Sequence, residues 1–308
     1  MPIFGINNGK LEVIPERAFD LEKDMQKLVE NNMMAIFGFK FVTSEFQLND
    51  LRVDSLGYDT ESNSFVIFEY KRDKNFSVID QGYAYLALLL NNKAEFVLLY
   101  NEKSSPQLKK DDINWSQSRV VFVSPSFTIY QRKAIEFQDL PIELWEVKEY
   151  SNNTILFNQI QAPQRGESIT TLTQKSEVVR RVSQEVKVYS EQYQLDKASE
   201  NIRSVYKELK DAILSIGSDI KIKPTAKYVA FIHANNFVDI VIYRNQLNLF
   251  LNMRKGTLND PRNFAKDVSS VGHWGNGDYQ VIMNQPSDLG YLLSLIRQSY
   301  DKNSVIKI

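Results

Sequence analysis

The 308-residue chain contains no cysteine and only two histidines, His233 and His273. Without cysteine it can form neither disulfide bonds nor thiolate metal sites. Any metal ion that this protein binds must therefore be held mainly by oxygen ligands.

The chain also lacks an excess of charge of either sign, because 37 Lys and Arg side chains face 38 Asp and Glu side chains and leave a formal net charge of -1. A nucleic-acid partner would have to meet a local basic patch. Residues 1–16 lack the basic start and long apolar core of a secretion signal, and no later stretch has the length of a membrane span. We therefore expect a cytoplasmic protein without membrane contacts.

What is present is the composition of a globular protein, with 43% hydrophobic, 12% aromatic and 24% charged residues. The length exceeds what one core usually serves and suits two domains. Residues 161–196 are rich in Gln, Ser, Thr, Glu, Lys and Arg, so we expect a polar, partly helical linker there. The two domains then span residues 1–160 and 197–308.

In the first half, segments with strand character alternate with segments of helical apolar spacing, which predicts an α/β domain with a mixed, partly parallel sheet flanked by helices. The polar turn at residues 59–64 predicts a hairpin between its two flanking strands. The expected helices are residues 21–36, 77–89 and 127–137, and the expected strands are residues 39–44, 52–58, 65–70, 95–100, 119–123 and 142–147.

In the second half, helices are expected at the two ends, with consecutive strands between them. This order predicts a smaller α+β domain with a mostly antiparallel sheet. The expected helices are residues 202–216 and 286–300, and the expected strands are residues 228–233, 237–244, 246–253 and 279–283.

Acidic residues lie within or directly after the two apolar segments that flank the predicted hairpin turn. Asp54 lies inside the first segment, and Glu69 and Lys71 follow the second. Side chains alternate along a strand, so Glu69 and Lys71 share one face, and hairpin pairing can place Asp54 beside them. Because an unpaired buried carboxylate is costly, such acids usually pair with a base or bind a cation.

Both outcomes are open to this group. Asp54 and Glu69, together with the backbone carbonyl of Tyr70 and water, suit Mg²⁺ or Mn²⁺, and Lys71 could orient a water molecule or stabilise developing negative charge. The alternative is a solvated ion pair on a surface hairpin.

The pattern of Asp54 followed by Glu69-Tyr70-Lys71 resembles the PD-(D/E)xK nuclease superfamily, with Val53 where the motif has proline. The following helix carries Gln81 and Tyr85, a QxxxY pattern typical of the branch with RecB-like and archaeal-type mismatch endonucleases. The resemblance implies a restriction-endonuclease-like fold for the N-terminal domain.

The resemblance also implies roles for further residues. Gln81 would contact the site or the substrate strand, and Tyr85 would support it. An acid from the first helix often joins such sites, for which Glu22 is the better match and Glu45 the competitor. Arg52 and Arg72 are candidates for phosphate contacts, although exposed solubilising charges are the simpler interpretation.

The implied function is a metal-dependent nuclease, an endo- or exonuclease acting on DNA in repair or defence. One alternative is a nuclease-like module that binds nucleic acid or a partner without turnover. A third hypothesis makes the C-terminal domain a sensor of a ligand or partner. Related nucleases often pair, so a homodimer is also expected.

The region after residue 200 resembles a C-terminal domain of unknown function in prokaryotic families that are sometimes labelled predicted transport proteins. Within it, Gly272, Gly275 and Gly277 surround His273 and Trp274. The glycines predict a tight loop. This loop either presents the imidazole and the indole to a ligand or nucleobase, or is a rigid turn whose tryptophan fills the core, and we favour the second.

Overall fold

The computed structural model describes residues 2–49, 51–72, 76–137, 139–161, 176–286 and 288–304. It forms two compact units, Met1–Val188 and Tyr189–Ile308. The division falls inside the expected linker, of which residues 162–175 lie outside the described part. Helix α6 (Glu177–Glu185) contributes Val182 to the core of the first unit, and helix α7 (Glu191–Leu195) packs through Leu195 on that of the second.

The first unit is built on a mixed seven-stranded sheet, in the order β3-β8-β7-β6-β5-β4 with β9 paired to β8. Strands β6, β7 and β8 are parallel, whereas the other pairs are antiparallel. The expected mixed sheet is confirmed. Its strands are β3 (Glu16–Arg17), β4 (Lys40–Leu48), β5 (Leu51–Asp59), β6 (Ser64–Tyr70), β7 (Arg119–Ser124), β8 (Ile142–Tyr150) and β9 (Ile155–Ile160).

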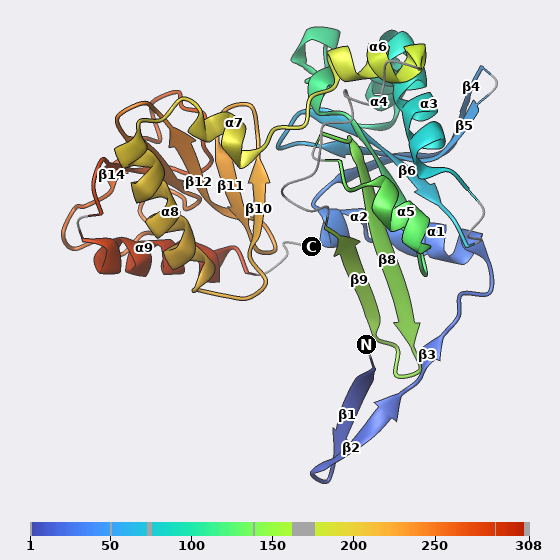
Figure 1. Cartoon of the computed structure of the whole chain (residues 1–308), viewed down its shortest axis with the longest axis horizontal. Coiled ribbons are helices and arrows are strands. Elements are labelled where there is room, and N and C mark those ends of the chain that lie inside the picture. The colour runs from blue at the N-terminus through green and yellow to red at the C-terminus, as the bar shows by residue number, and fades with distance from the viewer. Residues whose placement is uncertain are drawn as a thin grey trace. The chain divides into compact units, whose positions relative to one another are not determined.

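Helices cover both faces of this sheet (Figure 1). Alternate residues of β6 enter different cores: Phe65 and Ile67 pack with α3, while Val66 and Phe68 pack with α1 and α2. The helices are α1 (Glu22–Asn31), α2 (Met33–Phe37), α3 (Val78–Asn91), α4 (Lys93–Lys103), α5 (Ile129–Ala134) and α6, with short 3₁₀ turns at Lys110–Asp112 and Trp115–Gln117.

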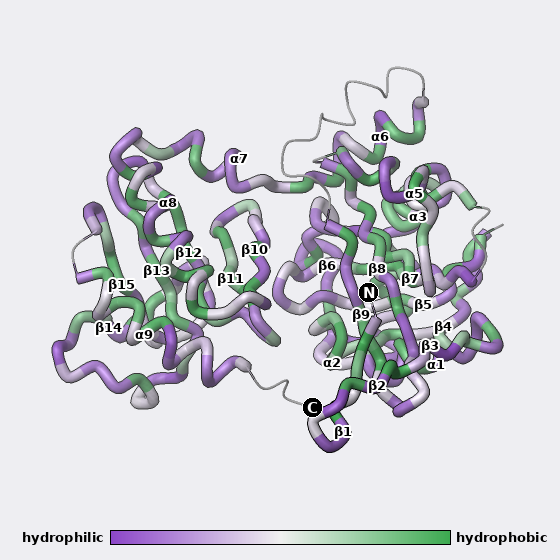
Figure 2. Tube along the Cα trace, turned by 60° about the horizontal axis from the view of Figure 1, so that its bottom comes forward, coloured by the Kyte–Doolittle hydropathy of each residue, from purple (hydrophilic) through white to green (hydrophobic). Residues whose placement is uncertain are grey.

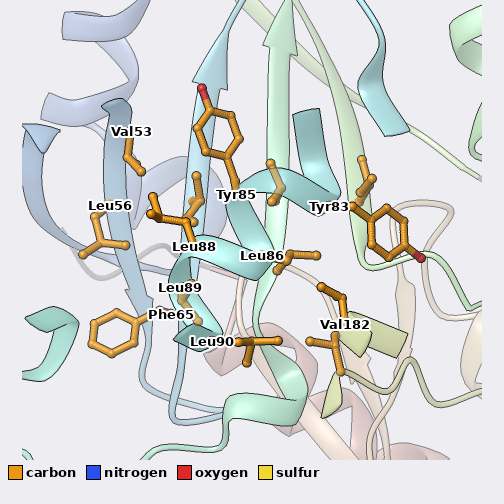
Figure 3. Packing of buried hydrophobic residues seen from close by; sticks show 14 of the residues in the cluster. Val53, Leu56, Phe65, Tyr83, Tyr85, Leu86, Leu88, Leu89, Leu90 and Val182 are labelled. Atoms are coloured by element: carbon orange, nitrogen blue, oxygen red, sulfur yellow. The ribbon is translucent and has the colours of Figure 1, made fainter. Parts of the chain in front are cut away.

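Helix α3 lies unusually close to the sheet at Gly82. A Cβ atom at this position would lie 2.4 Å from Ile142 Cδ1 and 2.9 Å from Ile142 Cγ1. The same helix buries Leu86 and Leu89, while the hydroxyl of Tyr85 points away from the labelled leucines (Figure 3). Gly82 therefore sets how deeply α3 sits on the strands.

Three expectations for the first unit need correction. Residues 95–100 are helical, within α4, because Phe96, Val97 and Tyr100 face the core at helical spacing while Leu98 is exposed. The helix expected over 21–36 is interrupted at Asn32, whose side chain donates to the Leu28 carbonyl. The helix expected over 127–137 is limited to α5.

The strands β1 (Ile3–Asn7), β2 (Lys10–Ile14) and β9 did not stand out in the sequence. Strands β1 and β2 form a separate two-stranded sheet.

The second unit contains a six-stranded antiparallel sheet in the order β10-β11-β12-β13-β15-β14. Helices α8 and α9 pack on one face of it, and α8 alternates hydrophilic and hydrophobic residues along its length (Figure 2). The expected antiparallel α+β architecture is confirmed. The elements are α8 (Glu200–Leu214), β10 (Lys221–Pro224), β11 (Val229–Ile232), β12 (Asn236–Ile242), β13 (Leu247–Leu251), β14 (Lys266–Asp267), β15 (Tyr279–Met283) and α9 (Leu289–Lys302).

No helix in the described ranges combines the length and the apolar character needed to cross a bilayer.

Candidate active site

The β5–β6 hairpin brings the predicted acids together. Its register pairs Ser55 with Phe68, so Asp54 and Glu69 come next along the two strands. The backbone N–H of Tyr70 donates to Asp54 Oδ2 at 3.1 Å, which fixes one carboxylate against the neighbouring strand. The hairpin geometry therefore places both carboxylates at the same end of the sheet.

Lys71 completes this group. Its Nζ donates to Glu69 Oε1 at 2.6 Å. Its backbone N–H donates to the Val123 carbonyl at 3.0 Å, so the β6–β7 ladder extends to the residue that carries the amine. Glu69 is only 3% exposed, and its second oxygen, Oε2, is buried and has no hydrogen-bond partner of normal geometry in the described chain, although the Tyr85 hydroxyl is close enough to lower the pKa of Glu69. Of the two oxygens of this buried carboxylate, one is thus hydrogen-bonded to Lys71 and the other is available to a ligand.

Burial and mutual repulsion make this pair of acids hard to ionise together. Burial, followed by the charge of Asp54, raises the pKa of Glu69 to about 7. Burial also raises the pKa of Asp54, although the Tyr70 hydrogen bond opposes that shift. Burial disfavours the charged form of Lys71, but the hydrogen bond and charge of Glu69 outweigh it and raise the pKa of Lys71. The lysine therefore stays cationic at neutral pH.

The two QxxxY residues of α3, Gln81 and Tyr85, differ in their hydrogen bonds and in their effect on the acids. The Tyr85 hydroxyl donates to the Arg52 carbonyl at 3.3 Å. Burial and the nearby charge of Glu69 raise the pKa of Tyr85. Gln81 lies one turn earlier, with its Oε1 buried and without a hydrogen-bond donor among the described residues. No hydrogen bond in the described structure joins Gln81 to the acids.

The structure distinguishes between Glu22 and Glu45, the two candidates for the additional acid of the site. Glu22, in the first turn of α1, accepts a hydrogen bond from the backbone N–H of Arg72 at 2.8 Å, and its charge raises the pKa of Asp54. Glu45 lies on β4 and pairs instead with Lys23 at 2.9 Å on the surface. Glu22 therefore borders the acidic pair, whereas Glu45 is occupied by Lys23.

The candidate phosphate-binding arginines flank the same region. The positive charge of Arg52 lowers the pKa of Asp54, although burial outweighs it. The guanidinium of Arg72 donates to the backbone carbonyl of Asp20, and this contact tethers the segment after β6 to the start of α1.

Two residues of α1 that were not singled out in the sequence hold β5 in place. Gln26 donates to the backbone carbonyl of Asp54 at 3.0 Å and to Glu30 at 2.9 Å. Glu30 in turn accepts from the Ser55 hydroxyl at 2.6 Å. Gln26 is 8% exposed and lies beside the buried Met25, so a polar residue on the apolar helix face was the signal that could have identified it.

The donor set fits a divalent cation that retains water. No group of three or more Asp, Glu or His side chains arranged for a metal ion occurs in the described part of the chain. However, Mg²⁺ often uses only one or two carboxylates with waters and substrate phosphate. Asp54 and the unpaired Glu69 Oε2 provide that minimum, with the carbonyl of Tyr70 as the further expected ligand. A cation there would relieve the repulsion between the acids.

In the second unit the tryptophan of the glycine loop is not buried. Trp274 is 59% exposed, with Lys227 Nζ 4.3 Å from its ring centre, so the expectation that it fills the core is wrong. His273 stacks on Phe250 with ring centres 4.6 Å apart. Gly275 also packs directly on Phe250, because a Cβ at this position would lie 2.4 Å from that ring. The histidine takes the covered place and the indole points outward.

The chain is 42% identical over 299 residues to an uncharacterized protein of Haemophilus influenzae, an alignment that covers 97% of this chain and 99% of the relative. Residues 191–303 match the family described as Domain of unknown function (DUF5655). The expected C-terminal domain of unknown function is therefore confirmed.

In three dimensions the chain is similar to a repair endonuclease from Pyrococcus abyssi, with 23% identity and a TM-score of 0.23. It is also similar to EndoMS in its apo form (22%, 0.26) and to SfsA from Pyrococcus furiosus in complex with Ca²⁺ (11%, 0.24). These matches cover 41%, 41% and 51% of this chain and 51%, 46% and 69% of the other chains. The chain thus spans about half the length of the first structure. Because these TM-scores are low, the structures support no argument about the site, which is inferred from the geometry of this chain alone.

Proposed function

The chain belongs to one family with the Haemophilus influenzae protein along nearly its whole length, and we propose that it is a Mg²⁺- or Mn²⁺-dependent nuclease acting on DNA, in repair or defence. The observation that carries the proposal is the buried Glu69, with one oxygen bound to Lys71 and the other unpaired beside Asp54. In an ordinary surface ion pair, neither carboxylate oxygen would be both buried and without a hydrogen-bond partner.

In this proposal Asp54 and Glu69, with the Tyr70 carbonyl, hold the cation. A bound ion would polarise the scissile phosphate and lower the pKa of an attacking water. Lys71 Nζ, fixed by Glu69 and cationic at neutral pH, stabilises the negative charge that develops on the phosphate oxygens. Its short hydrogen bond keeps it in place before substrate arrives.

The flanking residues orient the substrate. Arg52, whose charge lowers the pKa of Asp54, and Arg72, which follows Lys71, contact backbone phosphates, and these contacts fix the register of the DNA without reading its sequence. The half-buried Gln81, whose Oε1 has no hydrogen-bond donor among the described residues, contacts the substrate strand, and Tyr85 supports Glu69. Glu22 anchors Arg72 and adds negative charge close to Asp54.

The test is cleavage of DNA by the full chain with Mg²⁺ or Mn²⁺. Cleavage should stop in chelator and in Asp54→Asn, Glu69→Gln and Lys71→Met. The matched control is the Lys148–Glu16 pair, which has nearly the same length, 2.7 Å, and lies on the same sheet but more exposed. Lys148→Met and Glu16→Gln should leave cleavage unchanged. Activity retained in the three site variants would refute the assignment.

A second candidate function is binding of nucleic acid without turnover. The exposed indole of Trp274 beside Lys227 favours it, because an aromatic face and an ammonium suit a base and a phosphate. This candidate predicts salt-sensitive DNA binding that Trp274→Ala weakens, with no hydrolysis in either metal. We assign the nuclease domain to residues 1–160 and partner or ligand sensing to residues 197–308, joined by the polar segment 161–196.

A further inference from the structure

The connection between β13 and β14 in the second unit is a long loop, residues 252–265, that contains no helix or strand. Loops of this length without secondary structure are uncommon inside a compact domain and usually serve a function. The backbone N–H of Lys255 donates to the Asp278 carboxylate at 2.7 Å, and that of Gly256 donates to the Tyr279 hydroxyl at 2.7 Å. The first part of the loop is thereby fixed to the start of β15.

Side chains of α9 hold the middle of this loop. Gln298 accepts a hydrogen bond from the backbone N–H of Asn259 at 2.9 Å and donates to its carbonyl at 3.0 Å. The Tyr291 hydroxyl donates to Asp260 at 2.7 Å, and Asp260 also accepts from the backbone N–H of Ala265 at 2.7 Å. The single acid of the loop is therefore used to hold the loop together and to fasten it to α9.

The loop and the first residue of β14 carry four exposed cations: Arg254, Lys255, Arg262 and Lys266. Lys255 pairs with Asp267 at 2.7 Å. The other three form no ion pair with any acid in the part of the chain that the structure describes. Because the whole chain has a net charge of -1, these three side chains are a local excess of positive charge.

One of these cations is oriented in advance. The guanidinium of Arg262 lies 4.3 Å from the ring centre of Tyr291, the same tyrosine whose hydroxyl is held by Asp260. A stacked guanidinium loses less conformational freedom when it binds, and its forked N–H donors match the oxygens of a phosphate. The loop therefore presents an arginine that is already arranged to bind an anion.

The surroundings of the cations indicate which kind of anionic partner they suit. Residues 252–267, all of which the structure describes, contribute none of the exposed large apolar side chains of the chain. Binding to a membrane surface or to a protein partner normally adds buried apolar contacts to the charge. A phosphate backbone, in contrast, is bound by cations and hydrogen-bond donors alone. A nucleic acid is therefore the partner that matches this loop.

We propose that the loop binds the phosphate backbone of DNA through Arg254, Arg262 and Lys266. This surface uses neither Trp274 nor Lys227, so its backbone contacts are additional to any stacking of a base on that indole. Only the choice of DNA rests on the proposed function, since the same cations would meet the phosphates of any nucleic acid.

Fluorescence anisotropy of a labelled DNA duplex with the full chain, in EDTA and over a salt series, tests the proposal. Each phosphate contact contributes about 0.9 to the slope of log affinity against log salt concentration. Arg254→Gln with Lys266→Gln should therefore lower the magnitude of this slope by about 2. The matched control, Arg244→Gln with Lys207→Gln, also removes one exposed arginine and one exposed lysine of the second unit and should keep the parent slope.

Arg262→Lys tests the stacked guanidinium separately, because it keeps the charge and removes the planar fork. It should weaken binding several-fold at fixed salt while changing the slope little. None of the three replaced side chains holds the loop in place, so the Tm of these variants should match that of the parent chain.

A slope that the loop variant leaves unchanged, or that the control lowers equally, would overturn the proposal. A labelled polyglutamate chain provides the comparison with an acidic protein partner. If the loop variant lost binding to polyglutamate and kept the parent affinity for DNA, the loop would be a protein-binding surface and the proposal would be wrong. Binding is measured in chelator, where the nuclease site is inactive, so the loop proposal and the nuclease proposal can each fail without the other.

Discussion

The raised pKa of Glu69 makes the stability of the first unit depend on pH in a direction that can be measured. An acid whose pKa is higher in the folded than in the unfolded protein destabilises the fold once it must ionise. Below a pH of about 4.5 both states hold the proton and there is no penalty. The penalty grows as pH rises and is complete above a pH of about 7.

The difference between a pKa of about 7 and an ordinary value of 4.5 corresponds to about 3 kcal/mol of unfolding free energy. For a unit of this length, 1 kcal/mol shifts Tm by roughly 2–4 °C. Glu69→Gln, which cannot ionise, should therefore raise Tm by several degrees at pH 8 relative to the parent chain. At pH 4.5 the gain should disappear.

A divalent cation should raise the unfolding free energy where ionisation of Glu69 lowers it, because the cation binds the ionised carboxylate. At a concentration of 100 times its Kd, a ligand adds about 2.7 kcal/mol. Mn²⁺ should thus stabilise the parent chain more at pH 8 than at pH 5.5, and should stabilise Glu69→Gln little at either pH. Scanning calorimetry of both proteins and of the control Glu16→Gln measures these differences.

Two results would refute this reasoning. The first is a Tm difference between Glu69→Gln and the parent chain that is the same at pH 4.5 and pH 8, since the penalty must appear between them. The second is equal stabilisation of both proteins by Mn²⁺, which would place the cation elsewhere.

Further predictions concern one buried ion pair in the first unit and two loop residues in the second. Arg119→Met should lower the unfolding free energy by about 3–5 kcal/mol in chemical denaturation, because it removes the 2.9 Å ion pair of Asp59, a carboxylate only 2% exposed. Gly277→Ala should lower the unfolding free energy by at least about 1–3 kcal/mol in the same assay. At this position φ is 90°, and a Cβ would lie 1.9 Å from the Leu251 carbonyl oxygen. Trp274→Ala should change Tm by less than a degree or two, because the indole is mostly exposed, yet should weaken DNA binding in a fluorescence anisotropy titration.

The strands that carry the acids could be predicted because their signals were local. Apolar runs ended at a polar turn, and the hairpin register followed from it, so the proximity of Asp54, Glu69 and Lys71 was accessible from the sequence. Tyr85 was accessible through the resemblance of its QxxxY pattern to the nuclease branch. What the sequence could not provide was the burial of Glu69 and its open oxygen, since these depend on how α3 and β7 close over the hairpin.

The errors have a common origin in short segments whose periodicity is ambiguous. Residues 95–100 are apolar enough for a strand, and only their packing against the sheet shows that one helical face is buried. Trp274 points outward while its neighbours His273 and Gly275 pack on Phe250, a residue distant in sequence. Glu22 was the better match and Glu45 its competitor, and the structure distinguishes them through the pairing of Glu45 with Lys23 and the contact of Glu22 with Arg72.

The close approach of α3 at Gly82 has a consequence for how this site could be altered. Gln81 and Tyr85 belong to the same rigid helix, so their reach toward the acids depends on the height of its axis above the strands. A single methyl group at position 82 would meet Ile142 and lift the helix, and both polar groups would then withdraw together. A residue that touches no acid thus acts as a spacer, and paired changes at positions 82 and 142 offer a way to vary the depth of the site without replacing any of its charged groups.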